Sequence, residues 1–90
     1  MAHVRTWTVD ITISEHEDER RTHADAVLRG ARPGLGGQGE AHRRPSDQEV
    51  PEIGDELATA RALADLAYHL LDVTAADIEQ FTHKPARITS

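Results

Sequence analysis

The sequence of 90 residues contains no cysteine, and this absence excludes both a disulfide framework and a thiolate zinc site. Long apolar runs are also missing. The first ten residues, MAHVRTWTVD, alternate polar and apolar side chains and lack the continuous apolar stretch of a signal peptide. No segment reaches the ~18 apolar residues that cross a membrane. These absences predict a soluble, cytoplasmic protein without a membrane segment.

Length and charge narrow the remaining possibilities. A chain with 38% hydrophobic content at this length can bury one core, so a single domain spanning residues 1–90 is expected. The net charge is −6, and residues 46–81 carry nine acidic side chains against one base, Arg61. Such an acidic half repels phosphate backbones and anionic lipid surfaces, which argues against membrane and nucleic-acid partners.

Three segments are predicted to form an antiparallel sheet, at about residues 4–14, 20–29 and 35–43. The first two alternate with a period of two, as half-buried strands do. In the third, glycine weakens the strand but leaves space for a helix to lie close to the sheet. The residues expected on the core face are Trp7, Val9, Ile11 and Ile13 in the first segment, Thr22, Ala24, Ala26 and Leu28 in the second, and Leu35, Gly37, Gly39 and Ala41 in the third.

A long helix is predicted over about residues 51–73, with Pro51 in its first turn, where the missing N–H costs nothing. A second, short helix is predicted over about residues 75–83, because Thr74 and Asp77 have the spacing of a capping box. Helical periodicity selects a face that would pack on the sheet. Its members are Ile53, Leu57, Ala60, Ala64, Ala67 and Leu71, with Tyr68 at its border.

Leu63, Leu66 and Leu70 widen the apolar arc of the long helix to about 200°, more than covering a sheet requires. Two explanations remain open. The short helix could fold back and cover these leucines, or a partner chain could cover them. The three leucines are therefore the candidate interaction residues.

No catalytic, metal-binding or cofactor-binding residue is predicted. Gly34-x-Gly36-x-x-Gly39 has the spacing of a dinucleotide-binding turn, but no helix follows it, so a glycine-rich strand is expected instead. The six histidines lack metal-ligand spacing. Of these, His23 and His42 could meet across the outer sheet face, near Asp25 or Asp10. No convergent acid, base and nucleophile are visible, so an enzyme is not expected.

The strand that opens Trp7-Thr-Val-Asp-Ile, the Gly-x-Gly strand and the block Pro51-Glu-Ile-Gly-Asp-Glu-Leu-Ala58 together resemble the actinobacterial family called domain of unknown function 1876. The resemblance covers about Trp7 to Pro85. It implies a fold like that of double-stranded-RNA-binding domains, with three antiparallel strands packed on a helix. It implies no activity.

Two functions are weighed on this fold. The preferred one is a non-catalytic interaction or regulatory module that self-associates through a sheet edge or the leucine stripe. The alternative is binding of double-stranded RNA through an arginine-bearing face of the sheet. The regions that contact RNA in that fold are acidic here, which opposes the alternative. The arginines in question are Arg20, Arg21, Arg29, Arg32, Arg43 and Arg44.

Overall fold

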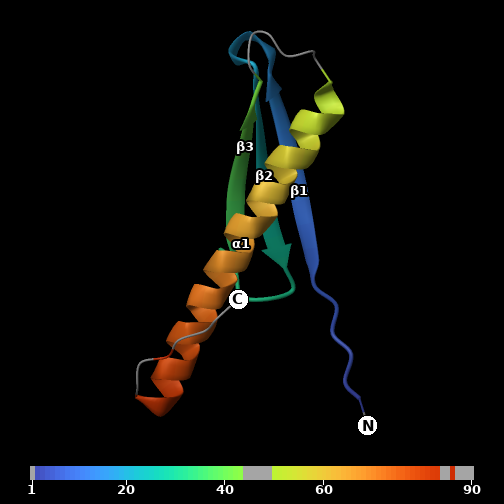
Figure 1. Cartoon of the computed structure of the whole chain (residues 1–90). Coiled ribbons are helices and arrows are strands. Elements are labelled where there is room, and N and C mark those ends of the chain that lie inside the picture. The colour runs from blue at the N-terminus through green and yellow to red at the C-terminus, as the bar shows by residue number, and fades with distance from the viewer. Residues whose placement is uncertain (1, 44–49, 84–85, 87–90) are drawn as a thin grey trace.

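The structure, a computed structural model of the chain, describes residues 2–43, 50–83 and 86. Strands β1 (Thr8–His16), β2 (Arg21–Arg29) and β3 (Gly36–His42) precede one helix, α1 (Pro51–Thr82). The strands form one antiparallel sheet in the order β1-β2-β3, and α1 lies on one of its faces (Figure 1). The predicted α+β class, with three antiparallel strands and a long C-terminal helix, is confirmed.

The first strand begins and ends later than predicted. It runs through Glu15 and His16, which pair with Thr22 and Arg21 of β2, and a 3₁₀ turn at Glu17–Glu19 makes the connection. Pairing thus extends the strand two residues beyond its predicted end at Ser14. The turn ends at Arg20 in the left-handed conformation, φ 50°.

One face of the sheet carries the small and apolar side chains. Residues directly opposite each other in antiparallel strands share a face. Ile11 pairs with Ala26, which pairs with Gly37, and Ile13 pairs in the same way with Ala24 and then Gly39. The alanines Ala24 and Ala26 are fully covered, so this is the face under α1, as the alternation of the second segment predicted.

Glycines on β3 bring α1 very close to the sheet. A Cβ atom at Gly37 or Gly39 would collide with the backbone of α1, at Ala62 and Leu66 for the first and at Ala58 and Ala62 for the second. The predicted role of the glycines, to let a helix lie close, is confirmed. Gly37 and Gly39 have no side chains, and Ala58 and Ala62 opposite them have small ones. The backbones of α1 and β3 therefore come almost into direct contact.

The helix is one continuous element, so the predicted second helix is wrong. Thr74 does not cap a new helix, because its Oγ1 donates a hydrogen bond to the Leu70 carbonyl one turn earlier at 2.8 Å. Asp77 instead accepts two hydrogen bonds from Arg32 in the β2–β3 loop, at 2.9 and 2.8 Å. No glycine or proline interrupts residues 55–82, so nothing ends the helix there.

The face of α1 that packs on the sheet also differs from the predicted one. Ala58, Ala62 and Leu66 are buried, and Leu70 and Val73 pack beside them. The predicted members Ile53 and Leu57 are exposed. The apolar arc was too wide for periodicity alone to fix the rotation of the helix, and the glycine row selects the face whose centre is alanine.

The helix crosses the sheet diagonally and extends past it (Figure 1). Near its start, Gly54 lies against Thr22 of β2, whereas Ala58 to Leu66 lie over the glycines of β3. Its 32 residues span about 48 Å, against about 30 Å for the nine residues of β2. The C-terminal third therefore projects beyond the sheet. Within the described residues, no helix combines the length and apolarity needed to cross a membrane.

Candidate interaction surface

Side chains of α1 close the outer edge of β3. The Gln38 N–H donates to Asp65 Oδ2 at 2.9 Å, and the Glu40 carbonyl accepts from Arg61 Nη1 at 2.6 Å. The next outward group, the Gly36 carbonyl, accepts from His69 Nδ1 at 2.7 Å. Unpaired backbone groups at a sheet edge are a template for pairing with another strand. On β3, three of these backbone groups already bind side chains of α1 and are not available to another strand.

At the opposite edge of the sheet, no strand of the described residues pairs with the outer side of β1. The helix packs on β3 and β2 and barely touches β1. The β1 residues on the helix side are consequently only partly covered. Val9 and Ile13 are 39% and 41% exposed, and Trp7, just before the strand, is 50% exposed. A partly exposed apolar row therefore lies beside a strand edge with which no other described strand pairs.

A surface pocket of about 260 Å³ lies at the start of α1, next to the C-terminal end of β1. Its walls come from the first turns of the helix, including Ile53, Gly54 and Leu57, and from Glu15 and Thr22 of the sheet. One carboxylate oxygen nearby in the sequence, Asp55 Oδ1, is covered and has no hydrogen-bond partner among the described residues. Apolar helix residues thus border a hollow at this end of the sheet, to which residues of all three strands contribute.

The three candidate leucines are not equivalent. Leu66 is 5% exposed and belongs to the core of the single chain, whereas Leu63 is 42% exposed. Leu70 is half-buried and packs against the core beside the β2–β3 loop. Within this conformation, Leu63 alone of the three presents a large surface to a partner.

Three of the six arginines of the alternative function are engaged with carboxylates. Arg21 binds Glu19 and Glu40 at 2.9 and 3.0 Å, Arg29 binds Asp10, and Arg32 binds Asp77. Charge already paired in this way is not available to release counterions from a phosphate backbone. Arg44 lies outside the described residues, and Arg20 and Arg43 flank the 3₁₀ turn, joined by a backbone hydrogen bond of 2.9 Å.

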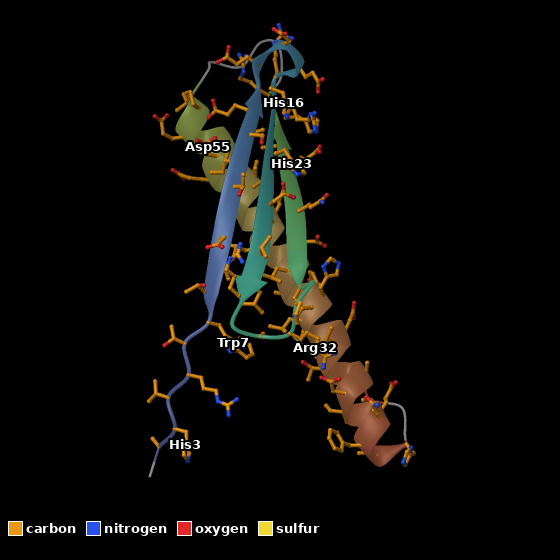
Figure 2. The ribbon with its side chains drawn as sticks, turned by 180° about the vertical axis from the view of Figure 1, so that it is seen from behind. His3, Trp7, His16, His23, Arg32 and Asp55 are labelled. Atoms are coloured by element: carbon orange, nitrogen blue, oxygen red, sulfur yellow. The ribbon has the colours of Figure 1, made fainter. Side chains whose placement is uncertain are left out.

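His23 and His42 converge on Glu40, on the face of the sheet opposite α1, where Figure 2 shows His23. His23 Nδ1 lies 3.3 Å from Glu40 Oε1, and its Nε2 lies 3.2 Å from Asp25 Oδ1. The hydrogen bond with His23, followed by that from Arg21, lowers the pKa of the Glu40 carboxyl. Asp10 is not part of this cluster, since it pairs with Arg29. No set of three such side chains in the described ranges is arranged to hold a metal ion.

These features define a small α+β protein in which a helix closes one edge of a three-stranded sheet and leaves the other edge open. The chain belongs to the Rv2632c-like family, whose model matches residues 5–87. It is 54% identical over 82 residues to the uncharacterized protein Mb1767 of Mycobacterium bovis, which covers 91% of this chain and 85% of the relative. The uncharacterized protein Rv2632c of Mycobacterium tuberculosis is 47% identical over 81 residues, 90% of this chain and 85% of the relative.

A solved structure shows the same fold. The crystal structure of Rv2632c superposes with a TM-score of 0.82 at 46% identity, covering 94% of this chain and all of that one. The relatives are mycobacterial proteins, in agreement with the actinobacterial resemblance of the sequence. No enzyme family is indicated by these matches.

The closure of the β3 edge gives a pH-dependent prediction. The hydrogen bond from His69 to the Gly36 carbonyl, then the charge of Asp65, raises the pKa of His69 above its ordinary 6.5. Because the pKa of His69 is higher in the folded than in the unfolded chain, protonated His69 stabilises the fold. This contribution is fully present below about pH 6.5 and is lost as the pH rises through the folded-state pKa. Thermal unfolding of the wild type should therefore shift to lower temperature above pH 6.5. His69→Gln should remove this slope, and His3→Gln in the exposed N-terminal segment should retain it.

Sequence reasoning identified the apolar row of β1 but expected α1 to cover it. The informative signal was the glycines of β3, since they show which strand the helix approaches most closely. A helix centred over an edge strand cannot also cover the opposite edge. The open surface of Trp7, Val9 and Ile13 follows from that position.

Proposed function

We propose that this chain is a non-catalytic interaction module that self-associates. The observation that carries the proposal is the edge strand β1, with which no other described strand pairs on its outer side and beside which Trp7, Val9 and Ile13 are 50%, 39% and 41% exposed. The accessible area is 7162 Å² for 9.9 kDa, whereas a compact monomer of that mass exposes about 5,200 Å². The radius of gyration is 16.9 Å, whereas a compact domain of this length has one of about 12 Å.

The excess is of the size that stable association buries. It amounts to about 2,000 Å² per chain, and standard protein interfaces bury about 800 Å² per partner. An interface of that standard size would bury less than half of the excess. A second copy is the partner present wherever the chain is made, so self-association meets this requirement without a further component.

The thin core supports the same proposal. The buried hydrophobic residues described are five alanines and three leucines, and no large side chain is fully buried. Alanine contributes little apolar area, and small domains are marginally stable even with a full core. Folding is therefore expected to be coupled to association, as in obligate homodimers.

The arrangement β1-β2-β3-α1 supports the view that the fold is a variant of the double-stranded-RNA-binding fold, in which the described residues ahead of β1 form no helix. We propose that the fold is used here without RNA binding. The arginines Arg21, Arg29 and Arg32 are paired with carboxylates, and the turn Glu17–Glu19 is acidic. No observation favours the RNA alternative over self-association.

The mass in solution tests the proposed function. Sedimentation equilibrium should give a species of at least twice 9.9 kDa at micromolar concentration. A folded species of the monomer mass would contradict the proposal.

A further inference from the structure

The backbone of β1 offers a defined set of outward-pointing groups. On β3, the groups that α1 binds belong to Gly36, Gln38 and Glu40, so these residues point away from β2. In an antiparallel ladder, successive residues alternate in the side to which their backbone groups point. The remaining β3 residues pair inward, with even-numbered partners on β2, in agreement with the hydrogen bond from Leu28 N to the Leu35 carbonyl at 3.0 Å.

The same alternation carries across β2 to the open edge. The odd-numbered residues of β2 direct their backbone groups to β1, where their partners are even-numbered. The outward groups of β1 therefore belong to Val9, Ile11, Ile13 and Glu15. These residues also place their side chains on the helix side of the sheet. Hydrogen bonding at this edge and burial of the apolar row would thus occur in one step.

Two copies of β1 could pair antiparallel with Asp10, Ile11 or Thr12 on the two-fold axis. These three registers differ in which side chains of the two copies face each other. With Asp10 on the two-fold axis, the two aspartates face each other, and like charges directly opposite are destabilising. With Thr12 on the axis, Val9 faces the carboxylate of Glu15. With Ile11 on the axis, Ile11 faces its own copy and Val9 faces Ile13, so all three apolar residues have apolar partners.

The diagonal of α1 complements this register. At the C-terminal end of β1, the first turns of the helix lie toward the open edge, where Ile53 and Leu57 border the pocket beside Glu15 (Figure 1). With Ile11 on the axis, Trp7 of the other copy is directly opposite Glu15. Trp7, which is 50% exposed, would then lie at the same end of the pair as Ile53 and Leu57 of the other copy. Apolar surfaces that lie apart in one chain come together in the pair.

Charges at the ends of the strand are also complementary. Continuation of the same register brings Arg5 of one copy toward Glu17 of the other, at the start of the acidic turn Glu17–Glu19. This contact joins opposite charges in both halves of a two-fold pair. Such rim charges accelerate association and weaken with salt.

We propose that two copies of this chain pair through β1, antiparallel and with Ile11 on the two-fold axis, to form a continuous six-stranded sheet with both helices on one face. This inference rests on the proposed self-association and adds the surface and register that produce it. The β3 edges, closed by α1, end the sheet and limit the assembly to two copies.

A matched pair of substitutions tests the surface. Val9→Lys places a charge at the proposed interface, and Val27→Lys makes the same change on the outer face of the central strand. The two valines are 39% and 42% exposed, so neither change is confined to a single-chain core. Because a buried unpaired ammonium is costly, Val9→Lys should raise the dimer dissociation constant at least about 100-fold. Val27→Lys should leave it within about threefold, since that position lies outside the interface.

Cross-linking tests the register and does not depend on the lysine variant folding. The chain has no cysteine, so introduced thiols are unique. In the proposed register, Asp10 of one copy faces Thr12 of the other as a non-hydrogen-bonded pair, with Cα atoms about 4.5 Å apart, within disulfide range. Mixing equal amounts of Asp10→Cys and Thr12→Cys proteins and oxidising them should yield the mixed disulfide, which intact mass distinguishes from either homodimer. Gln38→Cys on β3 should not cross-link.

The outcomes separate the two proposals. A predominant Thr12→Cys homodimer would overturn the Ile11 register. A persistent dimer mass without cross-linking, and with Val9→Lys still dimeric, would overturn the β1 interface while self-association stands. A monomeric wild-type chain would overturn both.

Discussion

Replacement of Gly39 by alanine is expected to reduce the free energy of unfolding by at least about 3 kcal/mol, the upper range for overpacking a core. The added Cβ would collide with the Ala58 carbonyl oxygen and the Ala62 nitrogen of α1. Both are backbone atoms of a continuous helix, so no side-chain rotation can relieve the contact. The helix must move away from β3, and the buried alanines would lose their contacts.

Gly54→Ala is the matched control for that experiment. Gly54 lies in α1, and a Cβ there would meet the Thr22 hydroxyl at 3.0 Å, a group that can rotate. Alanine also gains about 1 kcal/mol of helix propensity over glycine. This variant should unfold within about 1 kcal/mol of the wild type. Urea unfolding of both variants, monitored by far-UV circular dichroism, measures the difference between their free energies of unfolding. Equal stabilities of the two would contradict the close packing of α1 on β3.

The second large effect is expected for Leu66→Ala, at about 2–5 kcal/mol, the range for removing a buried leucine side chain. Leu66 is 5% exposed and lies over Gly37 in a core whose other buried members are mostly alanines, which cannot expand to fill the space. The cavity would therefore remain largely open.

Leu63→Ala provides the comparison on the same helix. Leu63 is outside the core of the single chain, so its loss should cost no more than about 1 kcal/mol. The two variants share the same chemistry and differ in burial, which makes their difference in unfolding midpoint the informative quantity. A larger loss from Leu63→Ala than from Leu66→Ala would mean that α1 is rotated relative to the orientation described.

The fold was largely predictable from the sequence, because each strand has its own pattern. The alternation from Trp7 to Ile13 and from Thr22 to Leu28 identifies two strands and the face of each that is apolar. Glycine at positions 37 and 39 indicated close approach of the helix. The break after Val73 was wrong, since a capping-box spacing occurs within helices as well as at their starts, and Thr74 bonds backward to Leu70.

The candidate surface was less predictable, because it depends on where the helix lies. Periodicity assigned Leu57 to the core and Leu66 to the surplus, whereas the glycine row reverses this assignment. A local pattern gives the width of an apolar arc but not its rotation against the sheet. The hydrogen bonds that close the β3 edge, from Arg61 and His69 and to Asp65, also depend on that rotation.

One arrangement accounts for both the core and the open edge. The glycines of β3 allow α1 to pack closely on that strand, and polar side chains of α1 bind the outer edge of β3. On β1, an apolar row stays partly exposed beside an edge with which no other described strand pairs. The thin core and the uncovered strand thus have the same cause. In the proposed dimer, a second copy of the chain would cover the exposed strand and add to the buried apolar area.

Sedimentation equilibrium of the wild-type chain, over a dilution series from about 100 μM to 0.1 μM, tests the central claim most directly, because linkage makes association depend on protein concentration. The account predicts a mass of twice 9.9 kDa at the upper concentrations, with any dissociation on dilution accompanied by loss of helical signal. A folded species of 9.9 kDa at every concentration would contradict it.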